Sequence, residues 1–93
     1  MSFVYLLHFE RPIYHAQHYL GFAEDLSRRI KQHRHGKSGA RLVEEFYNRG
    51  IGFVIARVWN DGDRDLERHL KRKYKSARQL CPECRRQQRG AES

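Results

Sequence analysis

Residues 3–9 alternate between two sets of apolar and aromatic side chains, which is the pattern of a β-strand. One face would carry Phe3, Tyr5, Leu7 and Phe9, and the other Val4, Leu6 and His8. Residues 18–22 have a second extended pattern, and the polar, proline-containing stretch 10–17 predicts a loop between the two. The start of the chain therefore predicts a hairpin of neighbouring strands.

The spacing of apolar residues changes to the helical period after residue 25. Asp25 is placed to cap a helix that ends at Gly36, and Gly50 is placed to end a second helix. The expected apolar stripes are Leu26, Ile30 and His33 in the first helix, and Ala40, Val43, Phe46 and Tyr47 in the second.

Residues 52–59 alternate again and predict a third strand, which the turn-forming residues 60–63 end. The alternation would set Phe53, Ile55, Arg57 and Trp59 against Val54, Ala56 and Val58. A last helix is expected over residues 64–77, with an apolar stripe of Leu66, Leu70, Tyr74 and Ala77. This order predicts an α+β domain over residues 1–79, with helices covering a small three-stranded, mostly antiparallel sheet. Residues 80–93 are expected to form a basic, frayed tail.

A net charge of +8, from 19 Lys and Arg against 11 Asp and Glu, makes polyanions the expected partners. Nucleic acid is favoured over a membrane or protein surface, because no large basic amphipathic helix with bulky apolar anchors is evident. No apolar run approaches the roughly 18–20 residues of a membrane span. The close pair Cys81 and Cys84 is not a disulfide framework, so we expect a soluble cytoplasmic protein.

Two tyrosines and an arginine–histidine pair are candidates for chemistry. Tyr5 and Tyr19 lie on the adjacent strands, and a side chain at Gly21 would block close approach of a phosphate or of backbone. The alternative is two core aromatics and a turn glycine. Arg29 and His33 project from one helix face, placing a permanent cation beside a group that exchanges a proton near neutral pH. The alternative is a solvated basic face, which is our interpretation of Arg28, Lys31 and Arg34.

Two further groups have the chemistry of metal ligands. Glu67 lies at the margin of the apolar face of the last helix, where its carboxylate could hold a divalent cation. The alternative is a surface ion pair with Lys71, worth only about 0.3–0.5 kcal/mol. Cys81 and Cys84 have the spacing of half a tetrahedral zinc site, which His69 or another chain could complete. The alternative is a pair of reduced cysteines packed near the last helix.

Taken together, these residues resemble the GIY-YIG nuclease domain. Its two signatures correspond to Phe-Val-Tyr at 3–5 and Tyr-Leu-Gly at 19–21, separated by close to the family's usual gap. Arg29 lies eight positions after Gly21, and His33 four positions further on, where the family has a functional arginine and histidine. Glu67 matches the family's metal-binding glutamate in position and context. The resemblance covers about residues 3–78.

The resemblance implies a three-stranded antiparallel sheet flanked by helices and a metal-dependent hydrolysis of phosphodiester bonds in DNA. Glu67 would hold Mg²⁺ or Mn²⁺, and Tyr5 or Tyr19 would deprotonate or orient the attacking water. Arg29 would stabilise the charge on the phosphate, and His33 would assist proton transfer. The basic residues expected to bind the nucleic-acid backbone are Arg28, Lys31, Arg34, Lys37 and Arg41.

The chain departs from the family pattern at two points. Phe3 and Val4 replace the glycine and isoleucine of the first signature, and no asparagine follows Asn60, although family members often carry a late one. Either Gln79 replaces this late asparagine or no residue does. A non-catalytic nucleic-acid-binding module on the same fold is therefore the alternative function. The sequence leaves open whether the partner is duplex, branched or single-stranded DNA or RNA, and leaves the oligomeric state open.

Overall fold

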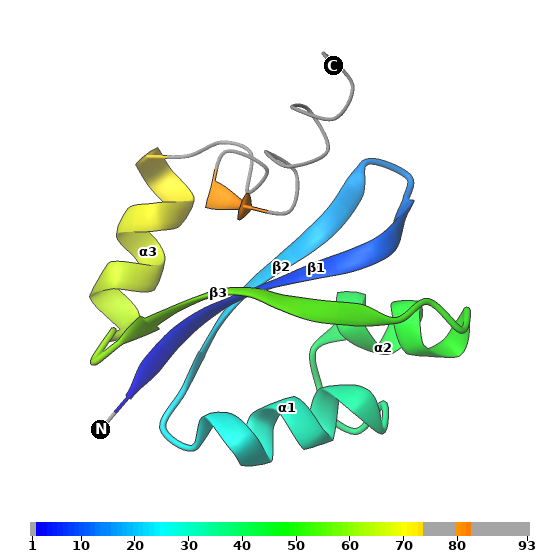
Figure 1. The fold of residues 1–93 in the computed structure, drawn as a ribbon, viewed down its shortest axis with the longest axis horizontal. Helices are drawn as coiled ribbons and strands as arrows, with labels where there is room; N and C mark the ends of the chain where they lie inside the picture. The colour runs from blue at the N-terminus through cyan, green and yellow to red at the C-terminus, as the bar shows by residue number, and fades with distance from the viewer. Residues whose placement is uncertain (1, 74–79, 83–93) are drawn as a thin grey trace.

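Three strands and three helices follow one another in the order that the sequence predicts (Figure 1). The computed structural model describes residues 2–73 and 80–82. The elements are β1 (Phe3–Ile13), β2 (Ala16–Ala23), α1 (Leu26–Arg34), α2 (Arg41–Asn48), β3 (Phe53–Asn60) and α3 (Arg64–Lys73). The predicted α+β class and the β-β-α-α-β-α order are confirmed.

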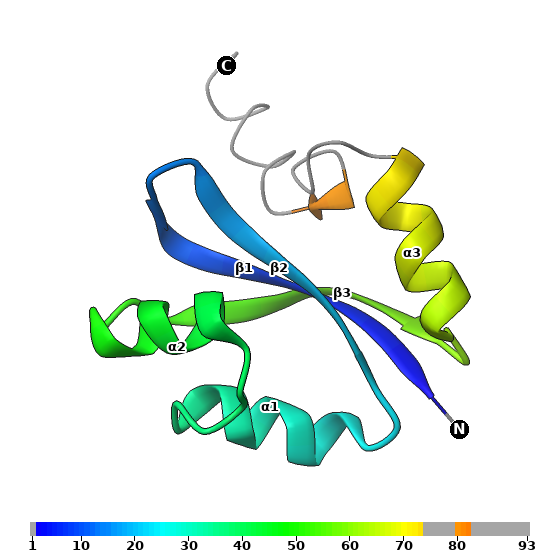
Figure 2. The ribbon, with the colours of Figure 1, turned by 180° about the vertical axis from the view of Figure 1, so that it is seen from behind.

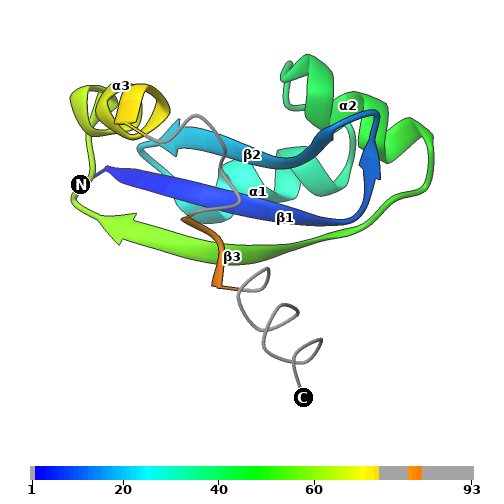
Figure 3. The same ribbon diagram turned by 90° about the horizontal axis from the view of Figure 1, so that it is seen from above.

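The strands form one antiparallel sheet in the order β2-β1-β3, so that the first strand is the central one (Figure 3). Helices α1 and α2 cover one face of this sheet, and α3 with residues 80–82 covers the other (Figures 1 and 2). Because both faces are covered, the central strand is buried on both sides from Val4 to Phe9. The two sets of alternating side chains predicted for residues 3–9 thus pack into two separate cores, one on each face of the sheet.

The first core lies under α1 and α2, where Tyr5, Leu7 and Phe9 of β1 meet the two helices. Its centre is a stacked aromatic pair, Phe9 and Phe46, with ring centroids 3.7 Å apart. The second core lies under α3 and contains Val4, Leu6, Leu20, Leu70, Leu80 and Cys81.

The loop predicted over residues 10–17 is mostly strand, which corrects the sequence-based expectation. β1 runs to Ile13 and β2 begins at Ala16, leaving a tight turn in which Tyr14 has a positive φ of 55°. Two hydrogen bonds hold the extension: the Glu10 amide donates to Gly52 O at 3.0 Å, and the Gln17 side chain to Phe9 O at 2.9 Å. Pro12 is tolerated because β1 pairs with β3 only as far as Phe9.

The strict alternation predicted for residues 52–59 is also wrong, because β3 contains a bulge. Leu6 pairs with Arg57 while its neighbour Leu7 pairs with Ile55, so Ala56 has no partner of its own. The extra residue reverses the side-chain alternation between the two halves of the strand. Phe53 therefore packs in the first core and Trp59 in the second.

The predicted helix ends are close to those observed. The Asp25 carboxylate accepts from the Arg28 amide at 3.1 Å, and Gly36 and Gly50 take positive φ angles of 69° and 70° after α1 and α2. Tyr47 was expected on the apolar stripe of α2, but its side chain is half exposed because Val43 and Phe46 occupy the buried face. None of the described helices is long and apolar enough to span a membrane.

The described end of the chain differs from the expected frayed tail. Leu80 and Cys81 are buried in the second core, so packing continues past residue 79. The expected apolar residues Tyr74 and Ala77 of the last helix lie outside the described residues, as do Gln79 and Cys84.

Candidate active site

Tyr5 and His33 form a buried polar contact between β1 and α1. Their side chains are almost fully enclosed, and the Tyr5 hydroxyl lies 2.7 Å from His33 Nε2, within one hydrogen bond. Tyr5 faces the first core because β1 alternates, and His33 faces it because it shares the inner stripe of α1 with Ile30. A tyrosine and a histidine far apart in sequence thus share one hydrogen bond inside the domain.

Tyr19 of β2 completes a cluster of three rings with these two residues. Its ring centroid lies 6.2 Å from that of Tyr5 and 5.4 Å from that of His33, and its side chain is only partly buried. Tyr5 pairs with Gly21 across the strands, and Leu7 pairs with Tyr19. Tyr19 is the most exposed of the three side chains, because Tyr5 and His33 are buried.

Gly21 provides the space in which the two tyrosine rings lie. A Cβ atom at this position would stand 2.5 Å from both Cζ and the hydroxyl oxygen of Tyr5, and 2.7 Å from Cε2 of Tyr19. The sequence predicted that a side chain here would block a phosphate or backbone, whereas the atoms that it would meet belong to the rings of the site itself.

Arg29 brings a positive charge to the tyrosine hydroxyls from α1. Its Nη1 donates to Ser38 O at 2.9 Å and to Gln32 Oε1 at 3.3 Å, which holds the guanidinium against the loop before α2. Its Nε is buried and has no hydrogen-bond partner among the residues that the structure describes. Burial lowers the pKa of Arg29, but interactions with Tyr5 and Tyr19 outweigh it and leave the pKa raised.

Burial sets the protonation states of the Tyr5–His33 pair. It raises the pKa of Tyr5 to about 12 against the opposing influence of Arg29, and the nearby charges of Tyr19 and Glu67 add to the rise. Burial, together with the charge of Arg29, lowers the pKa of His33 to about 4. At neutral pH the phenol is therefore protonated and the imidazole is uncharged.

The His33 imidazole is expected to make the domain less stable in mild acid. Its folded pKa of about 4 lies below the ordinary 6.5, so the unfolded chain binds more protons between these values. The free energy of unfolding should fall by up to about 3 kcal/mol as the pH drops through this window. Urea titrations of wild-type and His33→Gln protein, from pH 7 to pH 4, measure the effect.

The His33→Gln protein should lose this part of the pH dependence, because glutamine does not titrate. His15→Gln is the matched control, since His15 is exposed in the β1–β2 turn and its loss should leave the profile unchanged. A wild-type profile that runs parallel to that of His33→Gln would contradict the assignment.

Glu67 approaches the cluster from α3, on the first turn of the helix. Its side chain is about one-fifth exposed, and Lys71 Nζ lies 4.0 Å from its Oε2, at the outer limit of an ion pair. The carboxylate is close enough for its charge to help raise the pKa of Tyr5. A carboxylate that is partly exposed and only weakly paired fits the hard oxygen ligand that Mg²⁺ and Mn²⁺ prefer.

A groove of about 550 Å³ opens beside Arg29, between the end of β2, helix α1 and the start of α3. Arg28, Arg29 and Arg64 line it together with Gln32 and the acidic pair Glu24 and Asp25. Sequence reasoning missed Arg64, whose guanidinium lies 5.2 Å from the Phe22 ring centroid. The position of Arg64 could not be inferred from neighbouring residues in the sequence, because α3 and β2 are far apart in the chain and come together only in the folded domain.

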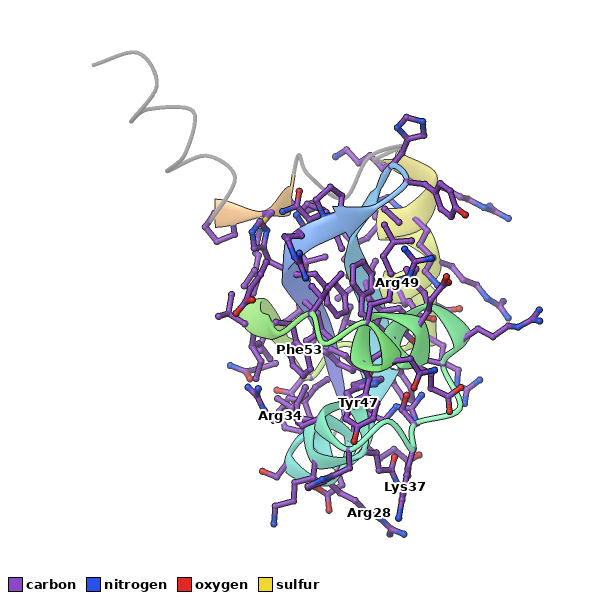
Figure 4. The ribbon with its side chains drawn as sticks, turned by 90° about the vertical axis from the view of Figure 1, so that its right-hand side faces the viewer. Arg28, Arg34, Lys37, Tyr47, Arg49 and Phe53 are labelled. Carbon is purple, nitrogen blue, oxygen red and sulfur yellow. The ribbon has the colours of Figure 1, made fainter. Side chains whose placement is uncertain are left out.

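A second groove, of about 480 Å³, continues from the first through the shared residues Arg28 and Gln32. Lys31, His35, Lys37 and Tyr47 form the rest of its lining, and Figure 4 shows Arg28, Lys37 and Tyr47 on this side of the molecule. We name the two adjoining grooves together the α1 groove. Three of the five predicted backbone-binding residues line it: Arg28, Lys31 and Lys37.

Arg34 and Arg41 were predicted to join that surface but do not line the α1 groove. The Arg34 guanidinium lies 4.5 Å from the Phe53 ring centroid, and both residues are labelled in Figure 4. They line another cavity, of about 240 Å³, which shares Tyr47 with the second groove. Arg41 is exposed at the start of α2.

The structure brings Tyr5, Tyr19, Gly21, Arg29 and His33 together from three different elements. The function of this site rests on its own residues and geometry, because comparison with protein-family models, with curated proteins and with solved structures finds no match.

Proposed function

We propose that this protein is a metal-dependent endonuclease that hydrolyses phosphodiester bonds of DNA, with a site of the GIY-YIG kind. The observation that carries the proposal is the convergence of Tyr5, Tyr19, Arg29 and His33 beside a groove lined by arginines. A structural core does not require a guanidinium beside tyrosine hydroxyls, whereas the stabilisation of charge on a phosphate does use a guanidinium.

Tyr19 and Arg29 are the residues that we expect to touch the substrate. Tyr19 is partly exposed, so its hydroxyl can orient an attacking water by a hydrogen bond. Arg29 lies beside the two tyrosines and lines the groove, where its charge would stabilise a phosphate in the transition state. Tyr5 and His33 are buried, and they hold the cluster in place from behind.

Glu67 is the residue that would hold a divalent cation. When bound, Mg²⁺ or Mn²⁺ would neutralise phosphate charge and lower the pKa of water. The Glu67 side chain is fixed to the first turn of α3, which Asp63 caps through the Leu66 amide at 2.8 Å.

The basic grooves and the net charge of +8 support a polyanionic substrate that is held through its phosphates. Contacts of this kind carry little sequence information, so binding should weaken steeply with salt and discriminate little between sequences.

Metal-dependent cleavage by the purified protein tests the proposal. Supercoiled plasmid and branched DNA oligonucleotides are incubated with Mg²⁺, with Mn²⁺ or with EDTA, beside a mock preparation from cells without the gene. We expect nicking in either metal, none in EDTA and none in the mock preparation. The absence of cutting on every substrate, or cutting that EDTA leaves intact, would contradict the proposal.

A non-catalytic nucleic-acid-binding module is the second candidate, favoured by the absence of any asparagine after Asn60 in the sequence. It predicts salt-sensitive binding of the same oligonucleotides with no cleavage in any metal. Fluorescence anisotropy on the cleavage substrates separates the two candidates.

A further inference from the structure

His8, His18 and Cys81 bring three metal-binding atoms together on the face of the sheet that α3 covers. His8 Nδ1 lies 3.2 Å from His18 Nε2 and 3.4 Å from Cys81 Sγ, and the three ligand atoms all lie within 4.8 Å of one another. His8 and Cys81 are buried, and His18 is partly buried. The proposed catalytic cluster lies on the opposite face, since Tyr5 belongs to the first core and Cys81 to the second.

The fold explains why these residues meet. His8 and His18 are direct partners across β1 and β2, so their side chains leave the same face of the sheet. Leu80 and Cys81 pack into the second core beside them (the segment drawn in orange in Figure 1). Two neighbouring strands and the segment 80–82 thus supply one ligand atom each.

Two of the three distances among these atoms are those of a tetrahedral zinc site, and the third is at most 4.8 Å. Zn–N bonds of about 2.05 Å and Zn–S bonds of about 2.3 Å place neighbouring N atoms about 3.3 Å apart, and N and S atoms about 3.6 Å apart. The observed 3.2 and 3.4 Å fall within a few tenths of an ångström of these edges. Imidazole and thiolate ligands favour Zn²⁺ over Mg²⁺.

We propose that His8, His18 and Cys81 bind a structural Zn²⁺ ion. Cys84 lies outside the described residues. The Cys-Pro-Glu-Cys segment has the C-x-x-C spacing with which two thiolates commonly bind one zinc ion. The two histidines supply the second half of the site, in place of the His69 considered from sequence. The proposal does not depend on the nuclease function.

A zinc ion here would tie the end of the chain to its first two strands. Because the unfolded chain has no preformed site, the free energy of zinc binding adds to the stability of the fold. EDTA would then act on both proposed metal sites. After EDTA treatment, Mg²⁺ is added back either alone or together with Zn²⁺, and cleavage and circular dichroism are recorded in parallel. The circular dichroism shows whether the fold was lost, and the cleavage assay shows whether activity was lost.

Metal analysis and cobalt substitution of the full, reduced chain test the site. We expect about one equivalent of zinc per chain, and a Co²⁺ form with intense tetrahedral visible bands and thiolate-to-cobalt charge-transfer absorption. His18→Ala and Cys81→Ser should lose the metal, whereas His69→Ala removes an exposed histidine of α3 and should retain it.

Three results would overturn the proposal: folded wild-type protein that takes up less than about a tenth of an equivalent, a weak octahedral cobalt spectrum, or undiminished zinc in Cys81→Ser. If the variants fail to fold, the cobalt spectrum of the wild type decides the question.

Discussion

Glu67→Gln is expected to lower the cleavage rate in Mg²⁺ by about 10³-fold or more, while the protein stays folded and still binds DNA. Glutamine keeps the size of the side chain but removes the charge with which it would hold a cation. Among the described residues the side chain makes no hydrogen bond, and Lys71 is its only ion-pair partner there, at 4.0 Å. Its loss should therefore change stability by less than about 1 kcal/mol.

Single-turnover cleavage and anisotropy binding measure the two effects separately. Asp65→Asn is the matched control, because Asp65 is exposed on the same first turn of α3 and also loses a favourable interaction with the helix dipole. Asp65→Asn should cut at the wild-type rate. Glu67→Gln protein that retains activity within about tenfold would remove Glu67 from the proposed site.

Gly21→Ala is expected to lower the free energy of unfolding by about 3 kcal/mol, at the upper end of the cost of overpacking. The added methyl group would lie 2.5 Å from two atoms of Tyr5, whose ring is fully buried and bonded to His33. Movement of that ring would break the Tyr5–His33 contact, so cleavage should fall together with stability. Urea denaturation of both proteins measures the loss.

Gly52→Ala provides the control for this substitution. A Cβ atom at Gly52 would meet only the end of the Glu10 side chain, at 3.0 Å, which can swing away. We expect a change of less than about 1 kcal/mol. Equal destabilisation by the two variants would show that the loss at Gly21 is a general cost of replacing glycine rather than a clash with the tyrosine.

Local patterns in the sequence were sufficient to predict the order of the helices and strands and to place part of the candidate site. Asp25 and Gly36 mark the ends of α1 because capping depends on a few neighbouring residues. The i, i+4 spacing of Arg29 and His33 placed both on one side of α1 for the same reason. Their meeting with Tyr5 then followed from the way in which α1 packs on the sheet.

Features that depend on distant partners could not be predicted in this way. The bulge at Ala56 exists only in the pairing of β3 with β1, and alternation within residues 52–59 gives no sign of it. His8, His18 and Cys81 have no common local pattern, because their meeting needs the strand register and the docking of residues 80–82. The sequence therefore identified Cys81 of the proposed zinc site and missed the two histidines.

The strand order also determines when the protein can finish folding during synthesis. β1 is made first but lies in the middle, and its second partner, β3, ends only at Asn60. Until then, the β1–β2 hairpin has an open edge and two apolar faces that α2, β3 and α3 have not yet covered. During synthesis, β1 therefore stays without its second partner strand until residues 53–60 have been made.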